Sequence, residues 1–210
     1  MSEIVRAERR HLAEAFVSSD PEAPTLCEGW TAADLVAHLV VREHEPLAAA
    51  GIVIPALADR HDAAIVRARQ RHSYPDLVER FRTGPPLLWK PIDGVANLTE
   101  LFVHHEDLRR GGGDTTPRPS TQTAHLEDAL WRALGRSGRF MTRALRGTGV
   151  EAVTPAGDRA RLRAGDRPVV LTGRPGELVL WLFGRRDAAA VELTGDPEAI
   201  ERALSADLGI

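Results

Sequence analysis

The segment TELFVHHEDLRR, residues 99–110, places carboxylates and imidazoles beside leucine and phenylalanine side chains. A solvent-facing helix surface explains the charged residues but not the large apolar residues between them. If the segment is helical, Glu100 and His104 are four positions apart and project from the same face. A carboxylate and an imidazole at that spacing can converge on one cation. The segment therefore predicts part of a divalent-metal site.

A third ligand has to come from another helix, and His38 is the best candidate. It lies at an apolar-flanked position, next to Leu39 and Val40, in a second segment that is predicted to be helical. Two histidines and one carboxylate suit zinc, nickel or ferrous iron, and they leave coordination positions open for water or substrate. Helical bundles build such sites from inward-facing residues of neighbouring helices.

Periodicity alone does not decide whether His104 or His105 is the histidine ligand of the 99–110 segment. His105 lies about 100° beyond His104 on an ideal helix and by angle faces the leucine stripe more directly. Asp107 is three residues after His104, so it either orients the His104 ring or is solvated, and Glu106 is interpreted as solvated. A glutamate and a histidine at this spacing also occur together by chance. His38 taken alone is more often a core histidine than a ligand.

The predicted elements that position these residues follow from apolar periodicity, capping residues and turn residues. Helices are predicted over 3–18, 32 to the mid-40s, 56–70, 74 to the TGPP segment, 98–110 and 122–146. From Thr148 onward, short β-branched runs separated by Gly, Pro and Asp predict strands and turns, with helices at PGELVLWLFGR and DPEAIERALS. We expect an α+β protein with a helical domain over 1–147 and a small α/β domain over 148–210.

Composition excludes several classes of protein. The chain has 210 residues, 43% of them hydrophobic, and a formal net charge of -3, which gives no electrostatic footprint for nucleic acid. No apolar run approaches the roughly 18 residues that span a bilayer, and the charged N-terminal stretch is not typical of a signal peptide. The single cysteine, Cys27, excludes an internal disulfide framework and is interpreted as a buried structural thiol, with a redox group or a fourth metal ligand as alternatives. These points indicate a cytoplasmic protein without a membrane or nucleic-acid partner.

Two motifs resemble those of a known family. The segment TLCEGWTAADLVAHL, residues 25–39, resembles the N-terminal signature of the mycothiol-dependent maleylpyruvate isomerase family, within the DinB-like helical-bundle superfamily. ELFVHHEDLRR is similar to that family's Glu-x-x-x-His-x-x-Asp-Leu helix, and its paired histidines resemble an actinobacterial branch of metal-binding proteins. LLWKP, PRP and GELVLWLFGR followed by VELTGD extend the resemblance over nearly the whole chain.

This resemblance implies an N-terminal four-helix bundle of up-down topology and metal ligands at His38, Glu100 and His104. It places His104, rather than His105, in the ligand position. It further implies that the metal is zinc, with water in the open position, and that the cofactor is mycothiol, whose thiolate such a metal would generate at neutral pH. Superfamily members often pair, so a homodimer is also expected.

Three hypotheses for function follow. The first is a metal-dependent enzyme that uses mycothiol for thiol transfer or isomerisation of a small electrophile, without maleylpyruvate itself being implied as substrate. The second is a metal-dependent hydrolase with zinc-bound hydroxide as nucleophile. The third is a non-catalytic metal-binding module, which predicts a closed coordination sphere with His105 or Cys27 as a fourth ligand.

Overall fold

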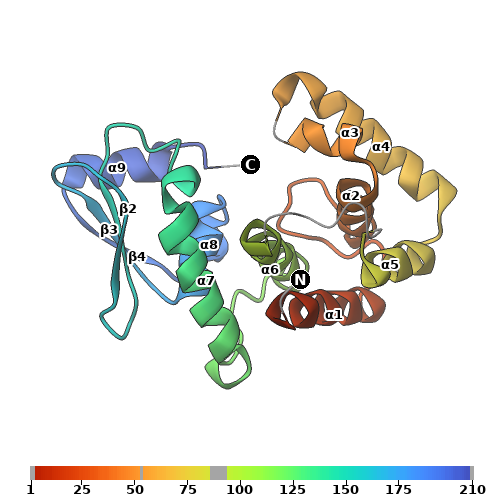
Figure 1. The fold of residues 1–210 in the computed structure, drawn as a ribbon, viewed down its shortest axis with the longest axis horizontal. Coiled ribbons are helices and arrows are strands. Elements are labelled where there is room, and N and C mark those ends of the chain that lie inside the picture. Colours follow the sequence, from red (N-terminus) through yellow and green to blue (C-terminus); the bar gives the residue numbers. More distant parts are fainter. Residues whose placement is uncertain (1–2, 53, 86–93, 209–210) are drawn as a thin grey trace. The chain divides into compact units, whose positions relative to one another are not determined.

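The computed structural model describes residues 3–52, 54–85 and 94–208, which form two compact units that divide after Asp114 (Figure 1). The first unit is built from helices, and the second combines helices with a four-stranded sheet. The predicted mixture of a helical portion followed by an α/β portion is therefore confirmed. The LLWKP motif at 87–91 lies outside the described residues.

The helices of the first unit agree closely with the sequence prediction. They are α1 (Glu3–Ser18), α2 (Ala32–His44), α3 (Pro46–Ala49), α4 (Ala58–Arg71), α5 (Tyr74–Thr83) and α6 (Gly94–Arg110), with 3-10 turns η1 (Ala50–Ile52) and η2 (Pro55–Leu57). Helix α6 begins four residues before the predicted start at Leu98. The short helix α3 and the two turns were not predicted, because single turns carry no periodicity.

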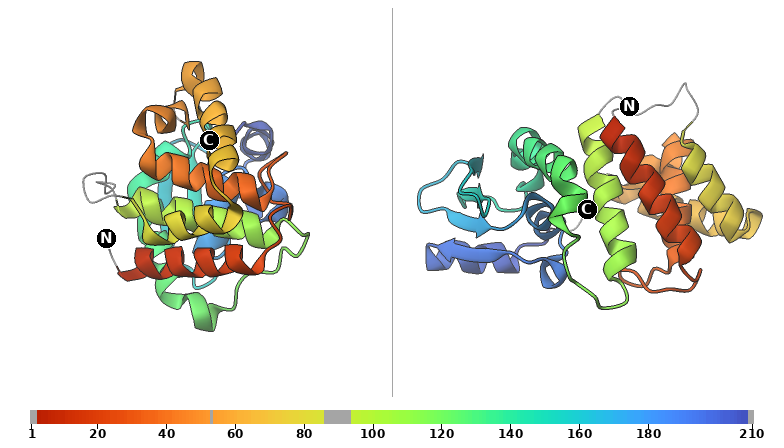
Figure 2. Two further views of the ribbon diagram at one scale, coloured as in Figure 1. Left: turned by 90° about the vertical axis from the view of Figure 1, so that its right-hand side faces the viewer. Right: turned by 90° about the horizontal axis from the view of Figure 1, so that it is seen from below.

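Helices α1 and α6 lie side by side in both views of Figure 2. Helix α1 also packs against α5, and α2 packs against α3, α4 and α5. The core between them consists of fully buried apolar side chains, among which Phe16 and Phe81 meet edge to face with ring centroids 6.0 Å apart. The helix α2 that carries His38 is thus enclosed by other helices.

Helix α2 begins at a capping box, as its sequence predicts. The Thr31 side chain accepts a hydrogen bond from the Asp34 backbone N–H, and the Asp34 carboxylate accepts one from the Thr31 backbone. Burial raises the pKa of Asp34, but the hydrogen bonds from Thr31 and Arg69 outweigh it and leave the pKa below its usual value. The cap fixes where the helix starts and so which face His38 occupies.

The only tyrosine of the chain, Tyr74, donates a hydrogen bond from its hydroxyl to the Phe16 carbonyl, joining α5 to α1 at 2.8 Å. Burial raises its pKa to about 12. Because the neutral phenol is favoured in the folded state, its contribution to stability is complete below the unfolded pKa of about 10 and is lost as the pH rises through 12. Absorbance at the phenolate band is expected to show a midpoint near 12 in the native protein and near 10 in denaturant. A native midpoint near 10, with the helical circular dichroism intact, would contradict this.

The second unit contains a mixed sheet with the strand order β2-β1-β3-β4. Its strands are β1 (Val150–Val153), β2 (Arg159–Arg163), β3 (Val169–Thr172) and β4 (Glu192–Gly195), and its helices are α7 (Ser120–Met141), α8 (Pro175–Leu182) and α9 (Pro197–Ser205), with a 3-10 turn η4 (Arg186–Ala188). Strands β1 and β3 are parallel, whereas β1–β2 and β3–β4 are antiparallel. Helices α8 and α9 lie within the two segments that were predicted to be helical, and each begins with a proline.

Helix α7 belongs to the second unit, since it packs against β2 and α8 (Figure 1). The division into compact units after Asp114 therefore differs from the boundary between 147 and 148 that the sequence predicted. The change from helical to strand patterning lies near Thr148, but packing assigns α7 to the sheet that follows it. A helix's own periodicity does not reveal which neighbour its apolar face covers.

Two glycines inside α7 give a matched test of this packing. A Cβ at Gly138 would lie 2.7 Å from Leu162 Cδ2 on β2, whereas a Cβ at Gly135 would meet no atom within 4 Å. Gly138→Ala is expected to destabilise the protein by about 1–3 kcal/mol through overpacking. Gly135→Ala is expected to stabilise it by about 0.5–1 kcal/mol, because alanine favours a helix interior. Urea denaturation of both variants checks this, and equal effects would contradict the contact.

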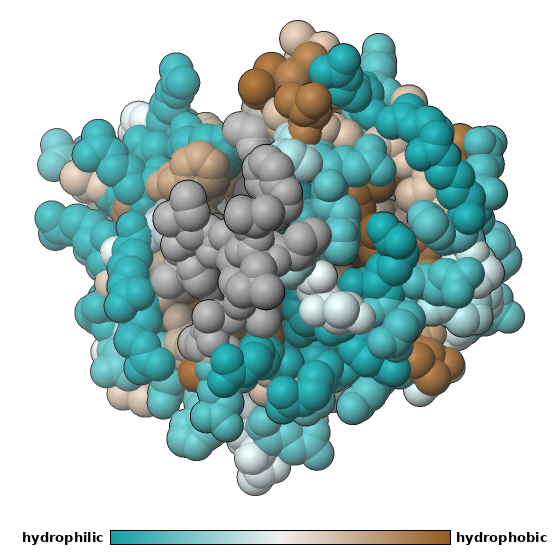
Figure 3. Space-filling view, turned by 45° about the vertical axis from the view of Figure 1, so that its right-hand side comes forward, coloured by the Kyte–Doolittle hydropathy of each residue, from teal (hydrophilic) through white to brown (hydrophobic). Residues whose placement is uncertain are grey.

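Side chains on the face seen in Figure 3 are mostly hydrophilic, and hydrophobic residues occur there in small separate groups. Among the described residues, none of the helices combines the length and the apolar character that a membrane span requires.

Candidate metal centre

The structure brings His38, Glu100 and His104 together. Helix α2 supplies the first and α6 the other two, and one ligand atom of each lies within 4.8 Å of the others. Glu100 Oε1 is 3.8 Å from His38 Nε2 and 3.9 Å from His104 Nε2. The two imidazole rings lie with their centroids 5.0 Å apart. The three side chains that the sequence singled out therefore converge from two helices.

Two of the converging atoms make no hydrogen bond within the described part of the chain. These atoms are His38 Nε2 and Glu100 Oε1, and both are buried. Buried polar atoms are nearly always hydrogen-bonded. Glu100 Oε1 is the oxygen that Arg42 Nε approaches in an ion pair, whereas His38 Nε2 has, among the described residues, only that carboxylate oxygen as a partner, at 3.8 Å, which fits a ring nitrogen that takes a cation. The charge of Glu100 is balanced by an ion pair with the Arg42 guanidinium, and Arg42 also donates a hydrogen bond to Asn97 at 3.3 Å.

The electrostatics keep His38 neutral and Glu100 ionised. Burial is the largest influence on His38, and with the nearby His104 it lowers the pKa to about 4 despite the opposing effect of Glu100. Burial raises the pKa of Glu100, but His38, Arg42 and His104 outweigh it and lower the pKa below its usual value. A neutral imidazole and a carboxylate are the protonation states in which these groups bind a metal ion.

Asp107 orients the ring of His104. The Nδ1 atom of His104 is 2.9 Å from Asp107 Oδ2, so an Nδ1–H would donate to the carboxylate and leave the Nε2 lone pair facing Glu100. The alternative in which Asp107 is solvated is wrong, because its side chain is fully buried.

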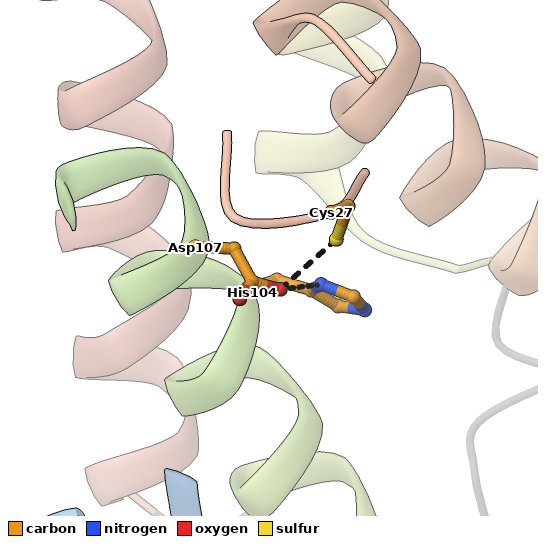
Figure 4. A group of neighbouring side chains, drawn as sticks. All are labelled: Cys27, His104 and Asp107. Atoms are coloured by element: carbon orange, nitrogen blue, oxygen red, sulfur yellow. Dashed lines mark hydrogen bonds and ion pairs between the residues drawn. The ribbon is translucent and has the colours of Figure 1, made fainter. Parts of the chain in front are cut away.

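Cys27 contacts the same carboxylate from the loop before α2. Its thiol donates to Asp107 Oδ2 at 3.2 Å, and Figure 4 shows both Cys27 and His104 reaching Asp107. The loop is held in place by a hydrogen bond from the Leu26 N–H to the Asp107 carbonyl at 3.0 Å. Cys27 is partly exposed rather than buried. It groups with His104 and Asp107, not with the set that contains His38 and Glu100.

His105 faces away from this cluster. Its Nδ1 atom lies 2.8 Å from Glu8 Oε1 on α1, so its role is to pair α6 with α1. Glu106 was interpreted as solvated, and this is wrong, because its side chain is 1% exposed and ion-paired with the buried Arg110 at 2.5 Å. His105 thus lies on the face of α6 that α1 covers, and Glu106 is buried beside the arginines of its own helix.

Sequence reasoning missed two residues next to the candidate ligands, His61 and Arg42. His61 Nε2 on α4 lies 2.8 Å from His38 Nδ1. Burial lowers the pKa of His61. The sequence held one indication that His61 is buried: it is spaced at helical period from Ala64, Ile65 and Ala68. The structure buries all four residues in one stripe of α4. Arg42 had no comparable signal, although it follows His38 by one helical turn.

Comparison with known proteins agrees with the resemblance. The family model described as the mycothiol maleylpyruvate isomerase N-terminal domain matches residues 3–109, just over half of the chain. A crystal structure of the mycothiol-dependent maleylpyruvate isomerase aligns with a TM-score of 0.57 at 17% identity, covering 91% of this chain and 90% of that one. A crystal structure of a mutant of that isomerase aligns with a TM-score of 0.58 at 16% identity and the same coverage, 91% and 90%.

At these identities the structural likeness establishes the fold. A comparison with curated proteins gave no match. The family model matches residues 3–109 of the chain and therefore shows which family the chain belongs to. The chain belongs to the mycothiol maleylpyruvate isomerase N-terminal domain family.

Proposed function

We propose that this protein is a divalent-metal-dependent enzyme that uses mycothiol for thiol transfer or isomerisation of a small electrophile. One observation carries the proposal: in a member of this family, His38, Glu100 and His104 place their ligand atoms within 4.8 Å of one another. The finer architecture that we propose around the site is a DinB-like up-down bundle of α1, α2, α5 and α6.

The donor set favours zinc, with nickel or ferrous iron as the alternatives. Two imidazole nitrogens and one carboxylate are typical of catalytic zinc, which keeps a further position for water or substrate. When bound, such an ion lowers the pKa of a coordinated thiol or water. His38 and His104 would bind it through Nε2, and Glu100 through a carboxylate oxygen.

The surroundings of the three residues support an open site over a closed one. The Glu100 side chain is 21% exposed, although its Oε1 atom is buried, so the edge of the cluster reaches the solvent. Cys27, a candidate fourth ligand, is engaged by Asp107 on the other side of the His104 ring. Arg42 is 19% exposed beside Glu100 and adds positive charge where a thiolate would approach.

Cobalt substitution tests the use of mycothiol. The visible spectrum of the cobalt protein is expected to gain a thiolate-to-cobalt charge-transfer band when mycothiol is added. Mycothiol with its sulfur alkylated is the matched control and should leave the spectrum unchanged. An unchanged spectrum with free mycothiol would contradict the proposal, and ester or amide hydrolysis by that same protein would favour the hydrolase instead.

A further inference from the structure

We propose that His61 is a positioning residue for the metal centre: it accepts the Nδ1 proton of His38 and thereby aims the Nε2 lone pair of His38 at Glu100 and His104. The inference rests on the proposed metal site and deepens it. The contact that motivates it is the 2.8 Å separation between His38 Nδ1 and His61 Nε2.

The tautomers follow from the chemistry of ligation. If His38 binds a cation through Nε2, its single proton sits on Nδ1 and has to be donated. The described atom within hydrogen-bond distance of that Nδ1 is His61 Nε2, which must then be the acceptor. The proton of His61 consequently sits on its own Nδ1. In the opposite arrangement His61 Nε2 donates, the proton of His38 moves to Nε2, and ligation is blocked.

His61 is held firmly enough to fix another ring. It is 5% exposed and belongs to the buried stripe of α4 that packs on α2. Its ring meets that of His38 at 86°, with centroids 5.0 Å apart. A Cβ on Gly51 would lie 2.9 Å from His61 Cβ, so η1 packs closely against the base of this side chain.

Each of the two candidate imidazole ligands thus has a partner at its Nδ1 atom. Asp107 contacts Nδ1 of His104 at 2.9 Å, and His61 contacts Nδ1 of His38 at 2.8 Å. In both cases Nε2 is left facing Glu100. Partners that orient a ligating histidine in this way change metal affinity by about 10–100-fold when they are removed.

Two substitutions at His61 separate positioning from packing. His61→Gln retains an amide oxygen near the place of the ring Nε2, whereas His61→Phe retains the ring volume without an acceptor. Zinc affinity, measured by chelator competition, is expected to fall about 10–100-fold in His61→Phe and to stay within about threefold of wild type in His61→Gln. His72→Phe, at the residue that follows the last turn of α4 and about 16 Å from His61 along the helix axis, is the control and should bind zinc as wild type does.

The outcomes distinguish a failure of the positioning role of His61 from a failure of the proposed metal binding. Wild-type affinity in His61→Phe, or equal losses in both His61 variants, would overturn the positioning role and leave the site in place. Absence of zinc binding by the wild-type protein would overturn the proposed function and the inference with it. In the metal-free protein, nitrogen-15 spectra of the imidazoles are expected to show the proton of His38 on Nδ1, and a proton on Nε2 would refute the inference directly.

Discussion

Replacing His38 or Glu100 by alanine is expected to abolish metal uptake. Purified wild-type protein should contain close to one equivalent of zinc or nickel by elemental analysis, and each variant should lose it, with affinity reduced more than about 100-fold. The reason is geometric: each residue supplies one of the three ligand atoms that lie within 4.8 Å of one another, so its removal leaves only two donors. Circular dichroism of each variant checks that the helices remain.

Two further variants test which residues are not ligands. His105→Ala and Cys27→Ala are expected to retain the metal, because His105 pairs with Glu8 and Cys27 with Asp107. A sharp loss of metal in Cys27→Ala would instead support the non-catalytic, closed site. Wild-type protein that neither contains nor takes up metal would reject the enzyme hypothesis. The three converging side chains would then be a buried polar cluster.

Glu43→Ala is expected to lower the free energy of unfolding by about 3–5 kcal/mol. Glu43 on α2 and Arg9 on α1 form an ion pair with side chains only 1% and 4% exposed. Arg9 donates through Nη1 to Glu43 Oε2 and to the Phe81 carbonyl, each at 2.8 Å, and its guanidinium lies 4.8 Å from the centre of the Phe81 ring. Truncating Glu43 leaves a charged guanidinium buried without its carboxylate. Urea denaturation measures the effect.

An exposed pair provides the control for that prediction. Glu79 and Arg82 form an ion pair at 3.1 Å, but their side chains are 64% and 43% exposed. Glu79→Ala is therefore expected to change stability by no more than about 0.5 kcal/mol. The double variant Arg9→Met/Glu43→Leu should recover most of the loss, because it removes both buried charges. A cost below 1 kcal/mol for Glu43→Ala would show that the pair is not a major contributor.

Local sequence signals predicted the elements well. Apolar periodicity and caps placed α1, α2, α5 and α9 close to their observed bounds, because helix starts at Thr31 and Asp196 depend on residues within one turn. The spacing of Glu100 and His104 likewise put both side chains on one face of α6 without reference to any other segment. These are properties of a single helix, and a sequence determines them locally.

Contacts between distant segments of the chain were decided by the tertiary structure. Helix angle left His104 and His105 as alternatives, and only the resemblance to a known family favoured His104. The packing of α1 on α6 supplies the physical reason, because it pairs His105 with Glu8 and leaves His104 beside Glu100. The same is true of His61, whose contact with His38 joins α4 to α2. Periodicity records which side of a helix is buried, but not which neighbour covers it. The sequence by itself thus determined the helices and the residue types at the site, and packing between helices decided which of those residues meet.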